Sequence, residues 1–218
     1  WAIGQYYDMY RNIESMRTLY HAFVEKAADF LVSYRDEETG LPLPSYDLWE
    51  ERRGILSFTT AAVYGALIAA AKLSEIFCHT EKARLYRQTA AHMKNAIGQY
   101  LYSEKHERFV RMIYPKKDGG YEIDATVDAS LYGMFAFGVY HPDDIKVKNT
   151  MKSIEETLWV QTDIGGVARY ERDSYQRVSN DESIPGNPWI ISTMWLAQYY
   201  TAIAKSAKDL EHVVRHLK

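Results

Sequence analysis

Residues 55–77 read ILSFTTAAVYGALIAAAKLSEIF, and this stretch decides the fold. It is apolar almost throughout and rich in small residues. A helix that is apolar on every face is buried on all sides, because no face is left to meet water. Residues 125–139 and 189–204 have the same character. We therefore expect three buried helices.

Helices of a second kind are expected beside these three. Apolar residues recur at three- and four-residue steps within 16–34, 86–100 and 147–158, which places them on one face of a helix and leaves the other face wet. A last, charged helix is expected at 208–217. The alternation predicts an all-α fold of two concentric layers, with amphipathic helices outside and buried helices inside.

The connections fall into two groups. Links from a buried to an amphipathic helix are short, at 78–82 and 140–144, whereas the links in the other direction are long. The long links are 35–54, 102–124 and 161–188, and the second is expected to contain a short strand or hairpin at 107–114. In a two-layered ring all long loops emerge at one end, and long loops on a rigid scaffold often carry function.

The count of helices does not close a ring of six pairs. Three outer–inner pairs, a piece before residue 13 and one trailing outer helix leave roughly a third of such a ring outside this sequence. The chain also opens on Trp1-Ala2-Ile3 without an initiator methionine. We expect residues 1–218 to form part of one helical barrel domain, incomplete at both ends; an open arc is the alternative.

Composition excludes several classes of function. The chain has 26 Lys and Arg against 29 Asp and Glu, so no basic field exists to bind nucleic acid. No apolar run reaches the roughly 18 residues needed to cross a membrane. One cysteine, Cys78, excludes an internal disulfide framework, and the seven histidines lack metal-ligand spacing. The sequence therefore predicts neither a metal nor a cofactor.

The first long loop contains a candidate acid. It reads GLPLPSYDLWEERRG from residue 40, so that Glu50 follows an indole and precedes a buried helix. Apolar surroundings raise the pKa of a carboxyl group and keep it protonated as a general acid. The alternative is that Glu50 and Glu51 are acids of the helix N-terminus, favoured by its dipole and answered by Arg52 and Arg53.

The third long loop contains a candidate sugar-binding group. It reads GGVARYERDSY from residue 165 and GNPW from residue 186. Arg169 and Asp173 could bind hydroxyl groups among aromatic side chains; the alternative is a solvated loop with a local ion pair. Asn187 and Pro188 are expected to begin the last buried helix, as its N-cap and first-turn residue.

Both loops resemble segments of one enzyme family. SYDLWEE from Ser45, followed by Phe58-Thr59 and an alanine-rich helix, is similar to the catalytic-acid segment of glycoside hydrolase family 15, the glucoamylase-like enzymes. RYxxD from Arg169, followed by GNPW, resembles that family's second conserved segment. The resemblance implies an (α/α) toroid of six helical hairpins, incomplete in this chain.

The resemblance also implies a reaction. Such enzymes hydrolyse terminal α-glucosidic bonds with inversion and release β-glucose, and Glu50 would be the general acid. The other implied site residues bind substrate: Asp47, Leu48, Trp49, Glu51, Arg169, Asp173 and Trp189. The substrate would be an α-glucan oligosaccharide or trehalose. We expect Glu50 and Arg169 to share one glucose-sized hollow.

The sequence departs from the family pattern at two places. The late Pro-Glu-Gln or Ala-Glu-Gln segment that supplies the general base is absent, and so is the early Trp-x-Arg-Asp segment. Inversion needs a second carboxylate about 6.5–9.5 Å from the acid. The chain is therefore expected to be inactive alone. The alternative is a non-catalytic carbohydrate-binding or regulatory module that keeps the fold.

Overall fold

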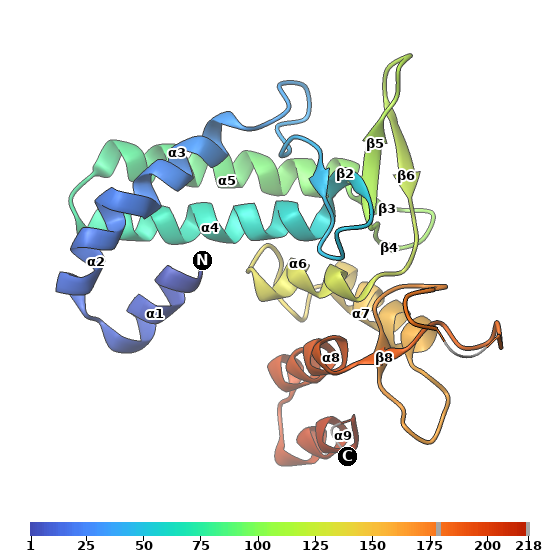
Figure 1. Ribbon diagram of the computed structural model, residues 1–218. Helices are drawn as coiled ribbons and strands as arrows, with labels where there is room; N and C mark the ends of the chain where they lie inside the picture. The colour runs from blue at the N-terminus through green and yellow to red at the C-terminus, as the bar shows by residue number, and fades with distance from the viewer. Residues whose placement is uncertain (178–179, 217–218) are drawn as a thin grey trace. The chain divides into compact units, whose positions relative to one another are not determined.

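The computed structural model describes residues 1–177 and 180–216, and its elements divide into two compact units (Figure 1). The first unit contains residues 1–100 and 137–139, and the second contains residues 101–136 and the chain from residue 140 onward. The described part is all-α in its main elements, with short hairpins in the loops. None of its helices is both long and apolar enough to cross a membrane.

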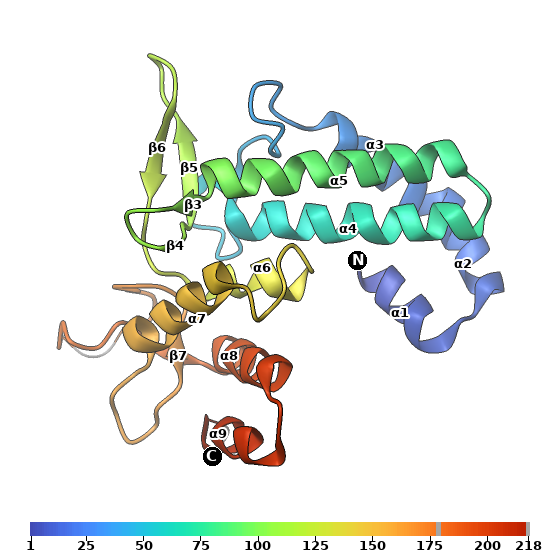
Figure 2. The ribbon, with the colours of Figure 1, turned by 180° about the vertical axis from the view of Figure 1, so that it is seen from behind.

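The first unit is built on a pair of long helices. Its elements are α1 (Ala2–Tyr10), α2 (Ile13–Leu19), the π-helix η1 (Tyr20–Val24), α3 (Glu25–Ser33), β1 (Ser45–Tyr46), β2 (Arg53–Leu56), α4 (Ser57–Ile76) and α5 (Thr80–Tyr100). Figures 1 and 2 show α4 and α5 side by side as an antiparallel pair. The link between them is short, as expected, because Cys78 adopts a left-handed φ of 61° and the N–H of His79 returns to the carbonyl of Ser74.

Helix α4 confirms the expectation of a buried helix. It spans most of the stretch from 55 to 77, and Ala61, Leu67, Ala71 and Leu73 are almost fully enclosed. Gly65 permits a close approach: a Cβ there would lie 2.9 Å from the carbonyl oxygen of Phe137 and 3.0 Å from the Trp1 ring. The hydroxyl groups of Tyr20 and Ser74 are 2.9 Å apart, which ties η1 to α4 inside the core.

The apolar face of the helix from Ile13 to Ser33, which includes η1, consists of two rows that differ in burial. Met16, Tyr20, Val24 and Ala28 are buried and form one row. A second row is exposed and consists of Leu19, Phe23, Phe30 and Tyr34. The rows are offset by three residues, so they face directions about 60° apart. Both rows therefore lie on one side of the helix, as expected, but only the first of them is buried.

In its described part, the second unit combines helices with three antiparallel pairs of short strands. Its elements are β3 (Tyr102–Ser103), β4 (Arg108–Phe109), β5 (Met112–Pro115), β6 (Tyr121–Asp124), the 3-10 helix η2 (Ala129–Tyr132), α6 (Gly133–Ala136), α7 (Ile145–Leu158), β7 (Val167–Ala168), β8 (Pro188–Trp189), α8 (Ile190–Ile203) and α9 (Ala207–His216). The short strand or hairpin expected at 107–114 is present as parts of two hairpins, because Arg108 pairs with Ser103 whereas Met112 pairs with Asp124.

Two expected helices of this unit differ from the structure. The stretch 125–139 holds only η2 and the single turn α6, because Asp128 is extended, pairs with Tyr170 and starts the helix late. Helix α8 begins at Ile190 rather than at Asn187. Pro188 is taken up in β8, opposite Ala168, and the Asn187 amide donates instead to the carbonyls of Tyr175 and Gln176.

Helix α8 is buried on one side only. Trp195 stacks on Tyr132 of η2 with ring centroids 4.2 Å apart, and its neighbour Leu196 is enclosed. Ile190, by contrast, is 84% exposed, so the expectation of burial on all sides is wrong for α8; α4 comes closer to it, with Ile68 37% exposed. The helix expected at 208–217 is present as α9, and residue 217 lies outside the described residues.

Candidate active site

The candidate general acid lies at the tip of a hairpin in the first unit. Strands β1 and β2 pair in the register Ser45↔Gly54 and Tyr46↔Arg53, so residues 47–52 form the loop between them. Strand β2 leads directly into α4. The hairpin therefore holds Glu50 at its tip, with strand β2 between it and the start of the buried helix.

Asp47 is the residue that closes this loop. Its side chain is buried, and Oδ1 accepts the N–H groups of Glu51 at 2.8 Å and Arg52 at 3.2 Å. The Asp47 N–H donates to the carbonyl of Arg52 at 2.7 Å, and its carbonyl accepts the N–H of Glu50 at 3.0 Å. A carboxylate that accepts several backbone N–H groups fixes the loop around it.

Glu50 adopts a conformation that is unusual for its residue type. Its φ is 61°, in the left-handed region, and its side chain is exposed. A non-glycine residue pays a free-energy cost there, and such outliers collect at functional sites. The alternative role in a helix N-terminus is wrong for both glutamates, because α4 begins at Ser57 and has no acidic residue in its first turn.

The other implied binding residues of this loop surround Glu50 in the sequence. Leu48 and Glu51 are exposed, and Trp49 is half-buried. The tip therefore presents an apolar side chain, an indole and two carboxylates together. The structure brings Asp47 to Glu51 together as one ordered turn.

The second candidate group is a buried ion pair in the second unit. Arg169 Nε donates to Asp173 Oδ2 and Nη2 donates to Oδ1, both at 2.7 Å. The Arg169 side chain is 5% exposed and that of Asp173 is fully buried. The pair is therefore local, as the alternative had it, but it is not solvated. A bidentate geometry fixes the plane of the guanidinium group.

Backbone contacts fix the carboxylate of this pair in turn. Asp173 Oδ1 also accepts the N–H of Tyr175 at 2.9 Å, and the Asp173 N–H donates to the carbonyl of Pro185 at 2.8 Å. Gly186 packs against it so closely that a Cβ would lie 2.7 Å from Asp173 Cβ. The glycine of the GNPW segment is thus required by the fold of this loop.

Aromatic rings surround the Arg169 guanidinium group. Its carbon lies 4.8 Å from the Tyr175 ring centroid and 5.2 Å from those of Tyr170 and Trp189. Cations are attracted to aromatic faces at these distances. The structure therefore brings together Arg169, Asp173 and Trp189, all three of which were expected to bind substrate.

Four residues of this region were not identified from the sequence as part of the site. They are Tyr170, Tyr175, Arg111 and Asp128. The tyrosines adjoin the RYxxD motif, and a search for rings next to Arg169 would have found them. Arg111 and Asp128 are isolated charges within otherwise apolar stretches, which is the signal that could have identified them.

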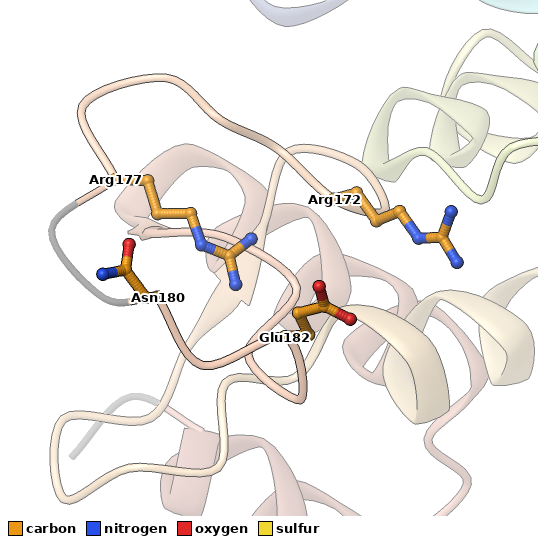
Figure 3. A pocket seen from close by; sticks show the side chains of 4 residues that line it. All are labelled: Arg172, Arg177, Asn180 and Glu182. Atoms are coloured by element: carbon orange, nitrogen blue, oxygen red, sulfur yellow. The ribbon is translucent and has the colours of Figure 1, made fainter.

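A polar hollow of about 500 Å³ lies on the same long loop. Figure 3 shows its lining side chains, Arg172, Arg177, Asn180 and Glu182. Arg177 Nη2 donates to the carbonyl of Ile184 at 2.8 Å, which holds one turn of the loop. Within the described residues, no group of three His, Cys, Asp or Glu side chains could hold a metal ion.

Glu50 and Arg169 belong to different units, and each unit is described by itself. The expectation that the two side chains share one hollow therefore stays a prediction. What the structure establishes is two separately ordered loops. One carries an acid in a strained turn, and the other carries a buried arginine with its aromatic neighbours.

Comparison with known proteins relates the whole chain to one family. Residues 5–217 match the sequence profile of glycosyl hydrolases family 15. An uncharacterised glycosyl hydrolase of Methanocaldococcus jannaschii is 30% identical over 96% of this chain, and a glucoamylase of a Clostridium species is 28% identical over 87%. The chain spans 31% and 29% of the lengths of these relatives.

A solved structure supports the same fold. The crystal structure of a bacterial glucoamylase complexed with acarbose covers 93% of this chain with a TM-score of 0.73, at 24% identity, and the match spans 32% of that chain. The helices described above therefore correspond to part of the helical toroid of a glucoamylase. With a profile match over nearly all of its residues, this chain belongs to glycosyl hydrolase family 15.

Proposed function

We propose that this chain is the part of an inverting family 15 glycoside hydrolase that carries the general acid and one of the sugar-binding loops. The observation that carries the proposal is the state of Glu50. It stands in a left-handed conformation at the exposed tip of a hairpin, and Asp47 holds it there. The position is that of the acid in the SYDLWEE motif.

In the proposed reaction, Glu50 protonates the glycosidic oxygen as the bond to the anomeric carbon breaks. The Arg169 guanidinium group, held in plane by Asp173, binds hydroxyl groups of the terminal glucosyl unit. Trp189 and the tyrosines beside Arg169 supply apolar faces for the sugar ring. A second carboxylate, supplied from outside residues 1–218, activates the water that attacks from the opposite side.

The exposed apolar rows support the proposal that further helices pack against residues 1–218. Leu19, Phe23, Phe30 and Tyr34 form an uncovered row on the helix from Ile13 to Ser33, and Ile190 begins another on α8. Exposed apolar rows of this size usually mark an interface. We propose that helices of the same domain cover them and complete the toroid, and that residues 1–218 alone do not hydrolyse glucosides.

The substrate class is an α-glucan oligosaccharide, with trehalose as the second candidate. The experiment incubates a longer polypeptide, containing residues 1–218 within a whole family 15 domain, with maltotriose, isomaltotriose or trehalose. NMR of the released glucose is expected to show the β-anomer first. Early appearance of the α-anomer would reject the inverting mechanism.

A non-catalytic carbohydrate-binding or regulatory module that keeps the fold is the second candidate. The same experiment separates the two candidates. A whole domain that binds these sugars without releasing glucose would favour the module. Release of glucose that is lost in Glu50→Gln would favour the enzyme.

A further inference from the structure

A second charged pair lies in the interior of the same unit as Arg169. Arg111 Nε is 3.2 Å from Asp128 Oδ2, and the two side chains are 2% and 1% exposed. A buried ion pair is a poor source of stability, because the cost of desolvating two charges offsets their attraction. The presence of this pair therefore calls for another explanation than stability.

Asp128 lies in the segment that pairs with the backbone carrying Arg169. Its neighbours form a short ladder with that loop: the N–H of Ala129 donates to the carbonyl of Arg169 at 2.8 Å, and the N–H of Glu171 donates to the carbonyl of Val127 at 3.0 Å. Asp128 Oδ1 accepts the N–H of Ser130 at 2.8 Å, which fixes the start of η2. Its other oxygen faces Arg111.

Arg111 lies over the Tyr170 ring, which is next to Arg169. The Arg111 guanidinium carbon lies 4.6 Å from the centroid of the buried Tyr170 ring, and that of Arg169 lies 5.2 Å from the same centroid. Two guanidinium groups thus share one aromatic ring, and each is paired with its own carboxylate. A shift of the Tyr170 ring would alter the packing that orients the Arg169 guanidinium plane.

We propose that Arg111 and Asp128 are positioning residues for the sugar-binding arginine, and that they act through Tyr170 and through the backbone of residues 169–171. This inference rests on the proposed role of Arg169. Neither residue is assigned a contact with the sugar. Their effect is on the orientation of a group that has to meet hydroxyl groups within hydrogen-bond distance.

The test is a double-mutant cycle in the whole family 15 domain, with acarbose binding measured by calorimetry. Arg111→Lys keeps the charge beside Asp128 but loses the planar group over Tyr170. It is expected to raise the Kd of acarbose about tenfold in the native background. In an Arg169→Lys background it is expected to add less than about twofold, because the positioned group is gone.

Arg108→Lys is the matched control. Arg108 is also a buried arginine, three residues earlier in the sequence, and its side chain donates to the carbonyls of Phe109 and Ala125. Its replacement is expected to lower Tm and to leave the Kd within about twofold. If Arg111→Lys does not fold, Asp128→Asn, which keeps the oxygen for Ser130, is taken through the same cycle.

The outcomes separate this inference from the proposed function. An unchanged Kd in Arg111→Lys overturns the inference, and so does an equal loss of affinity in both backgrounds, since either result means that Arg111 does not act through Arg169. An unchanged Kd in Arg169→Lys overturns the sugar-binding role of Arg169 itself. A loss that appears only in the native background supports the inference.

Discussion

Glu50 combines a strained backbone with an exposed carboxyl group. The strained backbone lowers the stability of the fold, whereas the exposed carboxyl group is available for chemistry. The left-handed conformation costs about 1 kcal/mol or more for a residue with a Cβ atom, whereas glycine adopts it freely. Within the described residues, the Glu50 side chain makes no hydrogen bond or ion pair that would offset this cost. We therefore expect Glu50 to serve the reaction rather than the stability of the fold.

A strained Glu50 predicts that glycine is more stabilising than alanine at this position, the reverse of the usual order. Glu50→Gly is expected to be more stable than Glu50→Ala by about 0.5–1 kcal/mol, because only glycine relieves the strain at a φ of 61°. Urea denaturation of residues 1–218 measures the difference. An alanine variant that equals or exceeds the glycine variant in stability would show that the turn is not strained.

Asp47 is predicted to matter for the position of Glu50 rather than for contact with sugar. Asp47→Ala removes the acceptor of two backbone N–H groups and is expected to cost about 1–3 kcal/mol. Asp47→Asn keeps one carbonyl oxygen there and is expected to cost less. Thermal unfolding measures both variants, and equal losses for the two would contradict the proposed hydrogen-bonding role.

At the scale of elements, one polar cluster joins α3 to α5. Lys82 Nζ lies 2.5 Å from Asp29 Oδ2, and the Tyr86 hydroxyl donates to Asp29 Oδ1 at 2.8 Å. Burial works against ionisation of Asp29, but the bonds from Lys82 and Tyr86 outweigh it and lower the pKa of the carboxyl group. Burial, and then the Asp29 acceptor, raise the pKa of Tyr86, so its hydroxyl stays a donor.

This cluster predicts a loss of stability in acid. Because the pKa of Asp29 is lower in the folded chain than its usual value of 3.8, its contribution is present above pH 3.8 and is lost as pH falls through the lowered pKa. The free energy of unfolding of Asp29→Asn is expected to fall less steeply over that range than that of the native chain. Identical acid dependence would contradict the pairing.

The sequence predicted the helices better than their ends. The periodicity of residues 86–100 and 147–158 identified α5 and α7, because amphipathic spacing follows directly from helical geometry. Residues 125–139 were expected to form one helix, because apolar character alone does not distinguish a helix from an extended segment paired within the core. Asp128, the one charge in that stretch, was the residue that decided otherwise.

The candidate site was predicted by motif and not by geometry. SYDLWEE and RYxxD pointed to two loops, and the role of these loops in a site stays a prediction. Spacing along the chain could not show that Asp47 would turn inward or that Glu50 would adopt a left-handed φ. The ladder between residues 127–129 and 169–171 joins segments about forty residues apart in the sequence. Such a contact depends on tertiary packing, which cannot be read from the pattern of a single sequence.

At the scale of the whole molecule, the chain spans 31% of the length of the Methanocaldococcus relative, and it leaves apolar rows uncovered. We therefore expect one substitution to affect the stability of residues 1–218 and that of the whole domain differently. Phe23→Gln is expected to change the stability of residues 1–218 by less than about 0.5 kcal/mol, because Phe23 is 59% exposed. In the whole domain the loss is expected to reach about 2 kcal/mol.

Chemical denaturation of both polypeptides measures the effect of this substitution. Met16→Gln, on the buried row of the same helix, is the control, and it is expected to destabilise both polypeptides. A Phe23→Gln variant that is equally neutral in the two contexts would contradict the proposal that further helices of the domain cover this row.

The most direct test of the account compares two leaving groups in Glu50→Gln of the whole domain. Maltotriose hydrolysis requires a proton on the departing oxygen, whereas α-glucosyl fluoride releases fluoride without one. The account predicts that kcat for maltotriose falls about 10²–10⁴-fold and that kcat for the fluoride changes by less than about tenfold. An equal loss with both substrates, or no loss with maltotriose, would show that Glu50 is not the general acid.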